Sequence, residues 1–510
     1  MGTIAENNTS IAKNTLFLYF RMFIMMAVSL YTSRVILRTL GVEDFGIYNV
    51  VAGIVILFSF VNGAMSIATQ RFISFALGEN DSKKVERVFS MSVTSHIVIA
   101  VLIIFIGESI GLLILHQMNF PHDRLYAVEW TYQLAIITCC LKVLRVPYNA
   151  SIISFEKMSF YAIISIVEVI LNLLVIFVVY FCAVDKLILY SLMLMLLTLI
   201  INVFYVSFCV KTFSSCKYSF VWDPNLFKKF IGFTSWSMLG SIASLSSQQG
   251  LNMILNIFCG VFVNAAVGVS NQVMAAFSTF MSNFQTAFNP QLIKSYARGD
   301  SFYLTNLIIR SSKCSYFLLL IVSIPIIIYC EFFLNIWLDE VPKYALEFSQ
   351  LMIIFVLLES LSGPLWISVQ ATGHIKYYQI FVSIIIFLNI PVALFLMYLG
   401  ASPIYVYVSR VCFNVLLLIF RIVYLNKILS FPFELFLKKV ILVTIKVTVL
   451  SLPIPFYLSR CLSISWVNVL FVLFISIIIT TYIIFMVGLD NNERKNIKIL
   501  LTKKIFSKIK

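Results

Sequence analysis

The sequence predicts an all-α integral membrane protein with about fourteen transmembrane helices. Its apolar composition, the regular spacing of its apolar runs and the alternation of its basic connections all point to this class. Of the 510 residues, 61% are hydrophobic and 12% are charged, whereas a soluble domain averages about 45–50% apolar and about 25% charged residues. A soluble core cannot bury this much apolar surface, so lipid must cover it.

Each predicted span is an apolar run close to the roughly 20 residues that a helix needs to cross a bilayer. The first six are expected at 14–37, 45–69, 88–115, 127–150, 160–181 and 187–210. A polar linker follows at 211–229. The later spans are expected at 230–258, 262–288, 308–333, 344–368, 376–399, 402–425, 436–457 and 464–488.

Lys and Arg are concentrated in alternate connections, and this bias sets the expected orientation. One set of connections is basic and includes 71–87, 211–229, 294–298 and the tail 490–510, while the other set holds one such residue or none per loop. The basic set is therefore expected to be cytoplasmic, with both termini inside and an even number of spans. A count of twelve would require two of the weaker runs to be wrong. The net charge of +15 lies in these short loops, which argues against a nucleic-acid partner.

The chain also resembles itself at an offset of about 220 residues. LGVEDFG (40–46) faces CGVFVNAAVG (259–268), ISFALGEND (73–81) faces IKSYARGDS (293–301), and Pro147 matches Pro364. Six spans form one repeat, so both halves enter from the same side and should be related by an axis along the membrane normal. The expected domains are a six-helix lobe at 1–210, the linker 211–229, a second lobe at 230–430, two further helices at 431–489 and a basic tail at 490–510.

Polar side chains are concentrated in spans 2, 7 and 8, whereas spans 5, 6 and 14 are almost purely apolar. In hydrocarbon such residues need partners or a water-filled cavity, although small polar residues also stabilise helix pairs. We weigh cavity lining above plain packing for spans 7 and 8. The polar residues of these two spans include Gln248, Gln249, Asn252, Asn271 and Asn283.

Several basic residues lie within the predicted spans, where ionisable groups are functional candidates. Arg21 lies about 10 Å from the cytoplasmic end of span 1, and either function or snorkelling explains it. Snorkelling is favoured for Lys142 and Arg145, near the inner end of span 4. Arg34, at the outer end of span 1, suits anchoring and ligand contact equally.

Two acidic residues lie at intermediate depth, Glu168 in span 5 and Glu359 in span 10. Each could take part in ion coupling, with structural pairing to a cation the favoured alternative. The excess of cations over anions at depth suits an anionic substrate, and the forked guanidinium of Arg is well matched to phosphate.

No pattern in the sequence indicates an enzyme. No nucleotide-binding loop of the form GxxxxGK[ST] is present, the four histidines have no metal-ligand spacing, and most of the ten cysteines fall inside apolar runs. We therefore expect no enzymatic activity and no metal or other cofactor, apart from a coupling H⁺ or Na⁺.

The segment 14–55 resembles the opening of the bacterial polysaccharide flippases, the Wzx-type O-antigen and capsule transporters. The matching features are Ser33-Arg34 near the outer end of span 1, Leu40-Gly41, and the turn Asp44-Phe45-Gly46-Ile47-Tyr48. The resemblance extends over the whole chain in topology, but only over about the first 80 residues in motif. No family motif fixes the roles of the candidate binding residues.

This resemblance implies a fold shared with MATE-type exporters, in which two six-helix bundles alternate between inward and outward states. It implies an oligosaccharide on undecaprenyl pyrophosphate as substrate, moved across the bacterial inner membrane for lipopolysaccharide O-antigen, capsule or exopolysaccharide synthesis. Arg21, Arg34 and Arg145 would contact the anionic headgroup, and Lys142 is a further candidate for substrate binding. The residues that would contact sugar hydroxyls are Gln248, Gln249, Asn252, Asn271 and Asn283. Partners would be the lipid-linked substrate, membrane lipids and polysaccharide polymerase or assembly proteins. A MATE-type drug exporter, a lipid II flippase and a non-transporting scaffold are the alternatives.

Overall fold

The computed structural model describes residues 17–116, 120–221, 223–338, 341–491, 493 and 494, with short gaps inside the first range. The gaps are 26–27, 29–30, 33–34, 37, 42–43, 45–46, 49–50, 52–54 and 56–58. Between 17 and 55 the described residues are helical. Helices make up nearly all of the described chain, which contains no strand, so the protein is all-α as the sequence predicts.

The chain divides into two compact units that do not follow the order of the sequence. Unit 1 comprises 1–242, 286–300 and 370–379, and unit 2 comprises 243–285, 301–369 and 380–510. Several helices are split between the units, among them the long helices α8 (Pro224–Cys259) and α9 (Val261–Ala297). The ends of α9 and α12 (Ala345–Thr372) therefore belong to the unit that contains the first six predicted spans.

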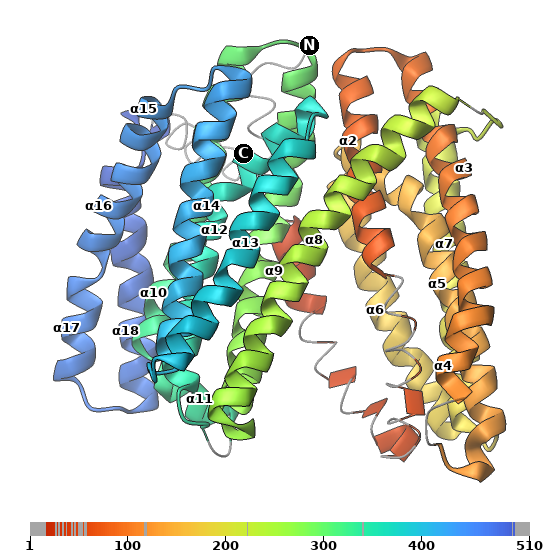
Figure 1. Ribbon diagram of the computed structural model, residues 1–510, viewed down its shortest axis with the longest axis horizontal. Coiled ribbons are helices and arrows are strands. Elements are labelled where there is room, and N and C mark those ends of the chain that lie inside the picture. The colour runs from red at the N-terminus through yellow and green to blue at the C-terminus, as the bar shows by residue number, and fades with distance from the viewer. Residues whose placement is uncertain are drawn as a thin grey trace, which may run out of the picture. The chain divides into compact units, whose positions relative to one another are not determined.

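Unit 1 is built around α5, which packs mainly against α2, α3 and α7 (Figure 1). Its main helices are α2 (Ser59–Gly78), α3 (Ser82–Ile106), α5 (Leu125–Ser154), α6 (Met158–Phe181) and α7 (Lys186–Thr212). A π-helical turn, Gly107–Gly111, follows α3. The buried Tyr132 of α5 donates to the carbonyl of Gly107 at 2.7 Å, and its hydroxyl fills the space that a Cβ at Gly111 would need.

Unit 2 contains the helices that follow α9, several of them broken. They are α10 (Ser301–Ile328), α11 (Cys330–Trp337), α13 (Lys376–Tyr398), α14 (Ile404–Leu429), α15 (Phe433–Phe436), α16 (Leu442–Ser451), α17 (Pro453–Cys461) and α18 (Trp466–Ile483). π-Helical turns follow α15 (Leu437–Ile441) and α18 (Ile484–Gly488). The expected span 308–333 is therefore divided between α10 and α11. The segment Phe433–Cys461, which contains the expected span 436–457, is long and apolar enough to cross a membrane. Helices α16 and α18 pack together (Figure 1).

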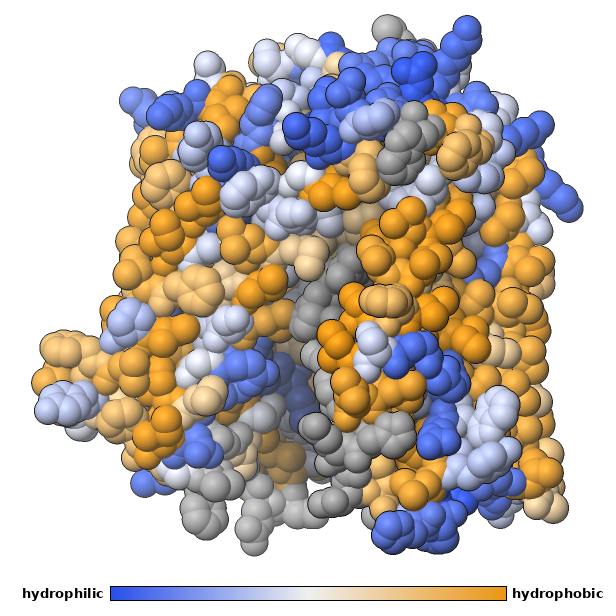
Figure 2. All heavy atoms as spheres, turned by 45° about the vertical axis from the view of Figure 1, so that its right-hand side comes forward, coloured by the Kyte–Doolittle hydropathy of each residue, from blue (hydrophilic) through white to orange (hydrophobic). Residues whose placement is uncertain are grey.

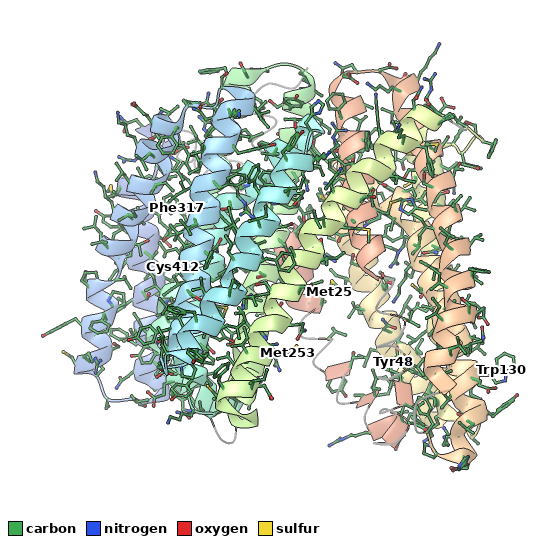
Figure 3. All side chains as sticks on the ribbon, viewed as in Figure 1. Met25, Tyr48, Trp130, Met253, Phe317 and Cys412 are labelled. Atoms are coloured by element: carbon green, nitrogen blue, oxygen red, sulfur yellow. The ribbon has the colours of Figure 1, made fainter. Side chains whose placement is uncertain are left out.

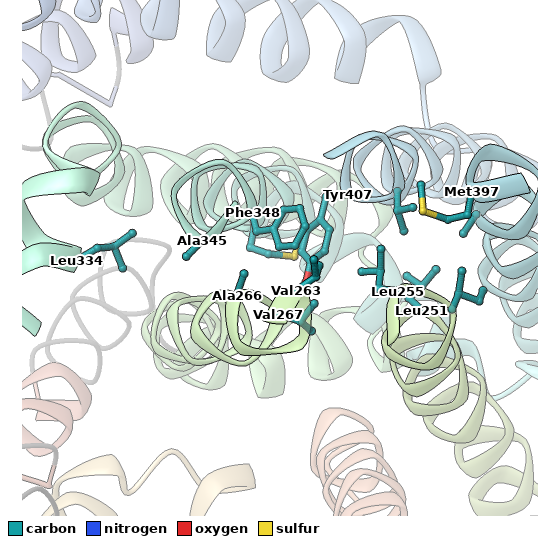
Figure 4. Close-up of a cluster of buried hydrophobic side chains, with 14 of the residues drawn as sticks. Leu251, Leu255, Val263, Ala266, Val267, Leu334, Ala345, Phe348, Met397 and Tyr407 are labelled. Atoms are coloured by element: carbon teal, nitrogen blue, oxygen red, sulfur yellow. The ribbon is translucent and has the colours of Figure 1, made fainter. Parts of the chain in front are cut away.

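A cluster of buried side chains from α8, α9, α11, α12, α13 and α14 forms an apolar core of unit 2 (Figure 4). At its centre, the rings of Phe348 and Tyr407 stack with centroids 4.0 Å apart. The hydroxyl of Tyr407 lies 3.0 Å from Oγ of Ser270. A buried tyrosine hydroxyl needs such a partner, so this contact sets the register of α9 against α14.

Large apolar side chains remain exposed along many helices (Figure 2). On α18, Val467 and Phe474 are 74% and 65% exposed, and in unit 1 Trp130 points outward at 48% (Figure 3). Among the described residues, ten helices are long and apolar enough to cross a membrane. A surface of this kind requires lipid, so the chain is a multi-pass integral membrane protein.

Local geometry supports the internal repeat. Pro147 lies inside α5 and Pro364 inside α12. Four residues after each proline, Ser151 and Ser368 donate to the proline carbonyl at 2.8 Å.

Residues with positive φ also recur at nearly the same offset. Gly41 (φ +80°) pairs with Gly260 (φ +76°), and Glu156 (φ +61°) pairs with Gly373 (φ +78°). Equivalent turns therefore close equivalent helices in the two repeats.

Candidate functional site

A cluster of charged and aromatic side chains lies inside unit 1. Arg145 of α5 donates to both carboxylate oxygens of Glu168 on α6, at 3.0 and 3.1 Å. The Arg145 guanidinium also lies 5.3 Å from the ring centroid of Tyr205, on α7. The Arg21 guanidinium lies 4.5 Å from the ring centroid of Tyr161, on α6. Two Arg and one Glu give this cluster a net charge of +1.

The predicted site residues of unit 1 have different outcomes. Glu168 lies in this cluster and has the structural pairing favoured from the sequence, with Arg145 and Glu168 only 17% and 22% exposed. Lys142 is exposed, as snorkelling requires. Arg34 lies outside the described residues.

A cavity of about 110 Å³ lies within unit 2, between α8, α12, α13 and α14. Its charged lining residues are Glu359 from α12 and Arg410 and Arg421 from α14. Its polar lining includes Gln248, Asn389 and Asn414, of which Asn414 donates to the Phe355 carbonyl at 2.9 Å. The structure therefore brings the predicted residues Glu359 and Gln248 to one cavity.

The other predicted sugar contacts also lie in unit 2. Gln248 donates to Oδ1 of Asn271 at 3.1 Å, which links α8 to α9. Asn252 donates to Oε1 of Gln249 at 3.3 Å within α8. Asn283 is buried and donates to the Thr279 carbonyl at 2.8 Å. Hydrogen bonds between and within helices thus already involve some of these polar side chains. Their contact with a sugar stays a prediction.

The sequence analysis did not select Arg410 or Arg421 as site residues. They are eleven positions apart on α14, which is three helical turns and places them on one face. That spacing could have identified them, because two Arg on one face of an apolar helix require a common polar environment.

Unit 1 also gathers the connections that the sequence predicts to be cytoplasmic, which we call the basic end. Here α2 ends at Gly78 and α9 ends at Ala297. Arg71 of α2 donates from Nε to the Gln370 carbonyl at 3.2 Å and from Nη2 to the Ala371 carbonyl at 3.0 Å. The last carbonyls of a helix lack intrahelical partners and carry partial negative charge, so the buried Arg71 caps α12.

A second contact at the basic end joins α9 to the turn after α5. Lys294 donates to Oε1 of Glu156 at 2.7 Å, and Gln291 donates to Oε2 at 3.0 Å. The Lys294 and Glu156 side chains are 17% and 16% exposed. In the repeat α2 corresponds to α9 and α5 to α12, so the two contacts are reciprocal, each joining the second helix of one repeat to the end of the fourth helix of the other.

At the opposite end of unit 1, one arginine joins three connections. Arg124 binds Asp44 through two bonds of 2.9 and 2.6 Å and binds Asp185 at 2.6 Å. Asp185 also caps α7 by accepting from the backbone N–H groups of Leu187 and Ile188. Partial burial acts to raise the pKa of Asp185, but the bonds from Arg124 and from these N–H groups outweigh it and hold the pKa below its ordinary value.

Comparison with known proteins gives one sequence relative and a group of structures. No family model matches the chain. The uncharacterized membrane protein EpsK of Bacillus subtilis (strain 168) is 21% identical over 316 residues. The match covers 61% of this chain and 62% of EpsK, so the chain spans less than two thirds of that relative's length.

The similar solved structures are transporters. A MATE protein in its straight conformation superposes with a TM-score of 0.72 at 12% identity, covering 83% of this chain and 96% of that one. An outward-facing multidrug resistance transporter of the MATE family gives 0.70 at 14%, covering 82% and 96%. A MOP superfamily transporter from Pyrococcus furiosus, described as having a binding pocket of reversed polarity that suggests a different function, gives the same values. The chain therefore has the fold of the MATE transporters of the MOP superfamily.

Proposed function

We propose that this protein is a flippase for anionic lipid-linked oligosaccharides. Its substrate would be an oligosaccharide unit on undecaprenyl pyrophosphate, moved from the cytoplasmic to the periplasmic leaflet of the inner membrane by alternating access. The observation that carries this proposal is the pair of interior clusters, each with two Arg and one Glu. A net positive interior suits a pyrophosphate and disfavours a cationic drug.

The contacts at the basic end fit alternating access. Arg71 and the Glu156–Lys294 pair hold the basic end together. Entry of a substrate from that side would require these contacts to separate. These bonds are few and polar, so water can replace them when the basic end opens. Such replaceable contacts allow the protein to exchange between a closed and an open state.

Arg21, Arg34 and Arg145 are proposed to meet the pyrophosphate, with Lys142 near the membrane interface. The polar face of α8 and α9 would meet sugar hydroxyls. Glu359 is the stronger candidate for coupling to a proton or sodium gradient, because Glu168 already has a close bidentate partner in Arg145.

Deletion of the gene tests the proposal. We expect surface polysaccharide to disappear and the lipid-linked unit to accumulate on the cytoplasmic leaflet. Accumulation on the periplasmic leaflet, or unchanged export, would reject it. Loss of resistance to cationic drugs would favour the MATE-type exporter instead, and immediate loss of viability with accumulated lipid II would favour the lipid II flippase.

Charge reversal tests the headgroup assignment. Arg21→Glu should abolish surface polysaccharide while the protein still inserts at normal levels. Lys438→Glu is the matched control, because the Lys438 side chain is 70% exposed and lies far along the sequence on α15–α16. Normal export by the Arg21→Glu variant would remove Arg21 from the site.

A further inference from the structure

The cavity within unit 2 has more positive than negative charge among the described residues that line it. Arg410 and Arg421 contribute two guanidinium groups and Glu359 one carboxylate. Arg410 contacts Sδ of Met274 at 3.5 Å and lies 5.0 Å from the ring centroid of Phe355, and neither partner carries a charge. Because the described lining carries two guanidinium groups and one carboxylate, this cavity should attract a small anion.

Glu359 lies near the middle of α12 (Ala345–Thr372), and the two Arg lie about 16 Å apart along α14. Both act electrostatically on Glu359. From the other walls, α8 contributes Ser244, Ser247 and Gln248, and α13 contributes Ile386 and Asn389, none of which titrates. The charge of the cavity therefore depends on a single titratable carboxylate.

The geometry points to a binding site for one small anionic group in this cavity, in which the Glu359 carboxylate competes with the ligand for the two guanidinium groups. The volume of about 110 Å³ holds a few water-sized groups, each with a share of about 30 Å³. It suits a halide or a single phosphate group and is too small for an oligosaccharide.

Protonation of Glu359 changes the net charge of the lining from +1 to +2. The anion should then bind more tightly, and by reciprocity a bound anion should favour the protonated carboxyl group. Proton and anion would therefore enter the cavity together. This site stands independently of the proposed substrate, since it can be measured on the purified protein even if deletion leaves polysaccharide export unchanged.

Thermal unfolding of the full-length protein in detergent tests the site, because a ligand of the folded state raises the midpoint according to its concentration relative to Kd. Sodium chloride and sodium phosphate are titrated against sodium gluconate at constant ionic strength. We expect saturable stabilisation that strengthens as the pH falls. Undecaprenyl phosphate forms a third arm: stabilisation by it alone, lost in the same variants, would identify the anionic group as a lipid phosphate.

Opposite responses of three variants separate this inference from simple misfolding. Arg410→Gln and Arg421→Gln should weaken anion binding at least tenfold, whereas Glu359→Gln should tighten it at least tenfold and remove its pH dependence. Lys438→Gln, on an exposed side chain, should bind as the unmodified protein does. Unchanged binding in Arg410→Gln, weaker binding in Glu359→Gln, or no response to any of the three anions would overturn the proposal.

Discussion

Gly78 is the last residue of α2 and Ala297 is the last residue of α9, the helix that corresponds to α2 in the repeat, and the two meet at the basic end of unit 1. A Cβ added at Gly78 would lie 2.6 Å from Cβ of Ala297 and 2.8 Å from the carbonyl oxygen of Lys294. The reciprocal contacts of Arg71 and Glu156 also lie at the basic end, so equivalent helix ends of the two repeats meet within unit 1.

Gly78→Ala should destabilise this crossing. The added methyl group has no room, and overpacking of this kind costs about 1–3 kcal/mol. The midpoint of thermal unfolding in detergent should fall. Gly63→Ala is the matched control in the same helix, because no atom lies within 4 Å of the position of its Cβ.

Adding Ala297→Gly to the Gly78→Ala variant should restore part of the lost stability. Recovery should be incomplete, because the backbone of Lys294 also lies close to Gly78. Equal midpoints for Gly78→Ala and Gly63→Ala would show that α2 and α9 do not meet as described.

Exchange of charges tests the Glu156–Lys294 contact. Glu156→Lys places two cations together in a half-buried position and should lower both stability and polysaccharide export. The double variant Glu156→Lys with Lys294→Glu should recover much of the loss, because it restores an ion pair with reversed polarity. The coupling energy from the four proteins of this cycle is expected at about 1–3 kcal/mol, and a value near zero would contradict the contact.

The backbone conformation at Glu156 allows an independent test of whether its carboxylate contributes to transport. A non-glycine residue in the left-handed region costs roughly 1–2 kcal/mol, and Glu156 has φ +61° where its counterpart is Gly373. Glu156→Gly relieves this strain and removes the carboxylate. If the ion pair matters to transport, this variant should export less polysaccharide even where its thermal stability is unchanged.

The sequence was sufficient to predict features that depend on composition and local pattern. The all-α class, the positions of most helices and the matched turns of the repeat follow from apolar runs and from glycines such as Gly41 and Gly260. The pairing of Glu168 with a cation was also expected, because α5 and α6 are adjacent helices of one hairpin.

Features that depend on contacts between distant helices could not be predicted. Arg71 binds carbonyls about 300 positions away, and no pattern near either partner indicates this contact. Membership of the ends of α9 and α12 in unit 1 likewise depends on tertiary packing. The cavity that joins Glu359 to Arg421 required the register of α12 against α14, which apolar helices alone do not specify.

Asp185 should make the folded protein less stable at acidic pH. Because its pKa in the folded protein is lowered, the Arg124–Asp185 bond contributes fully above the ordinary aspartate pKa of 3.8 and is lost as the pH falls through the lower folded value. The contribution is about 1 kcal/mol or less, because Asp185 is 32% exposed and water screens the pair.

Asp185→Asn isolates that contribution. Asparagine caps a helix as well as aspartate does, so the cap of α7 survives while the charge is removed. The variant should be less stable than the unmodified protein at pH 7, and the difference should disappear as the pH falls through the lowered pKa of Asp185 in the folded protein. Asp185→Ala should lose roughly 1 kcal/mol more by also removing the cap. A difference between Asp185→Asn and the unmodified protein that does not change with pH would contradict this account.

Within unit 2, Lys313 joins α10 to the segment that follows α18. Its side chain is 2% exposed, and its ammonium group donates to Glu493 at 2.9 Å and to the Gly488 carbonyl at 3.4 Å. A Cβ added at Gly488 would lie 2.8 Å from the ring of Phe317, one turn beyond Lys313 on α10. Glu493→Ala should destabilise the protein by about 3–5 kcal/mol, because it leaves a buried cation without its closest partner.

The double variant Lys313→Met with Glu493→Gln should be nearly as stable as the unmodified protein, since replacing both members of a buried ion pair is often neutral or stabilising. Thermal unfolding of Glu493→Ala and of the double variant separates these effects. If Glu493→Ala and the double variant unfold at the same temperature, the segment after α18 is held by its apolar contacts. If Glu493→Ala alone is unstable, the buried pair ties the last two helices to α10, and these helices belong to the structural framework of unit 2.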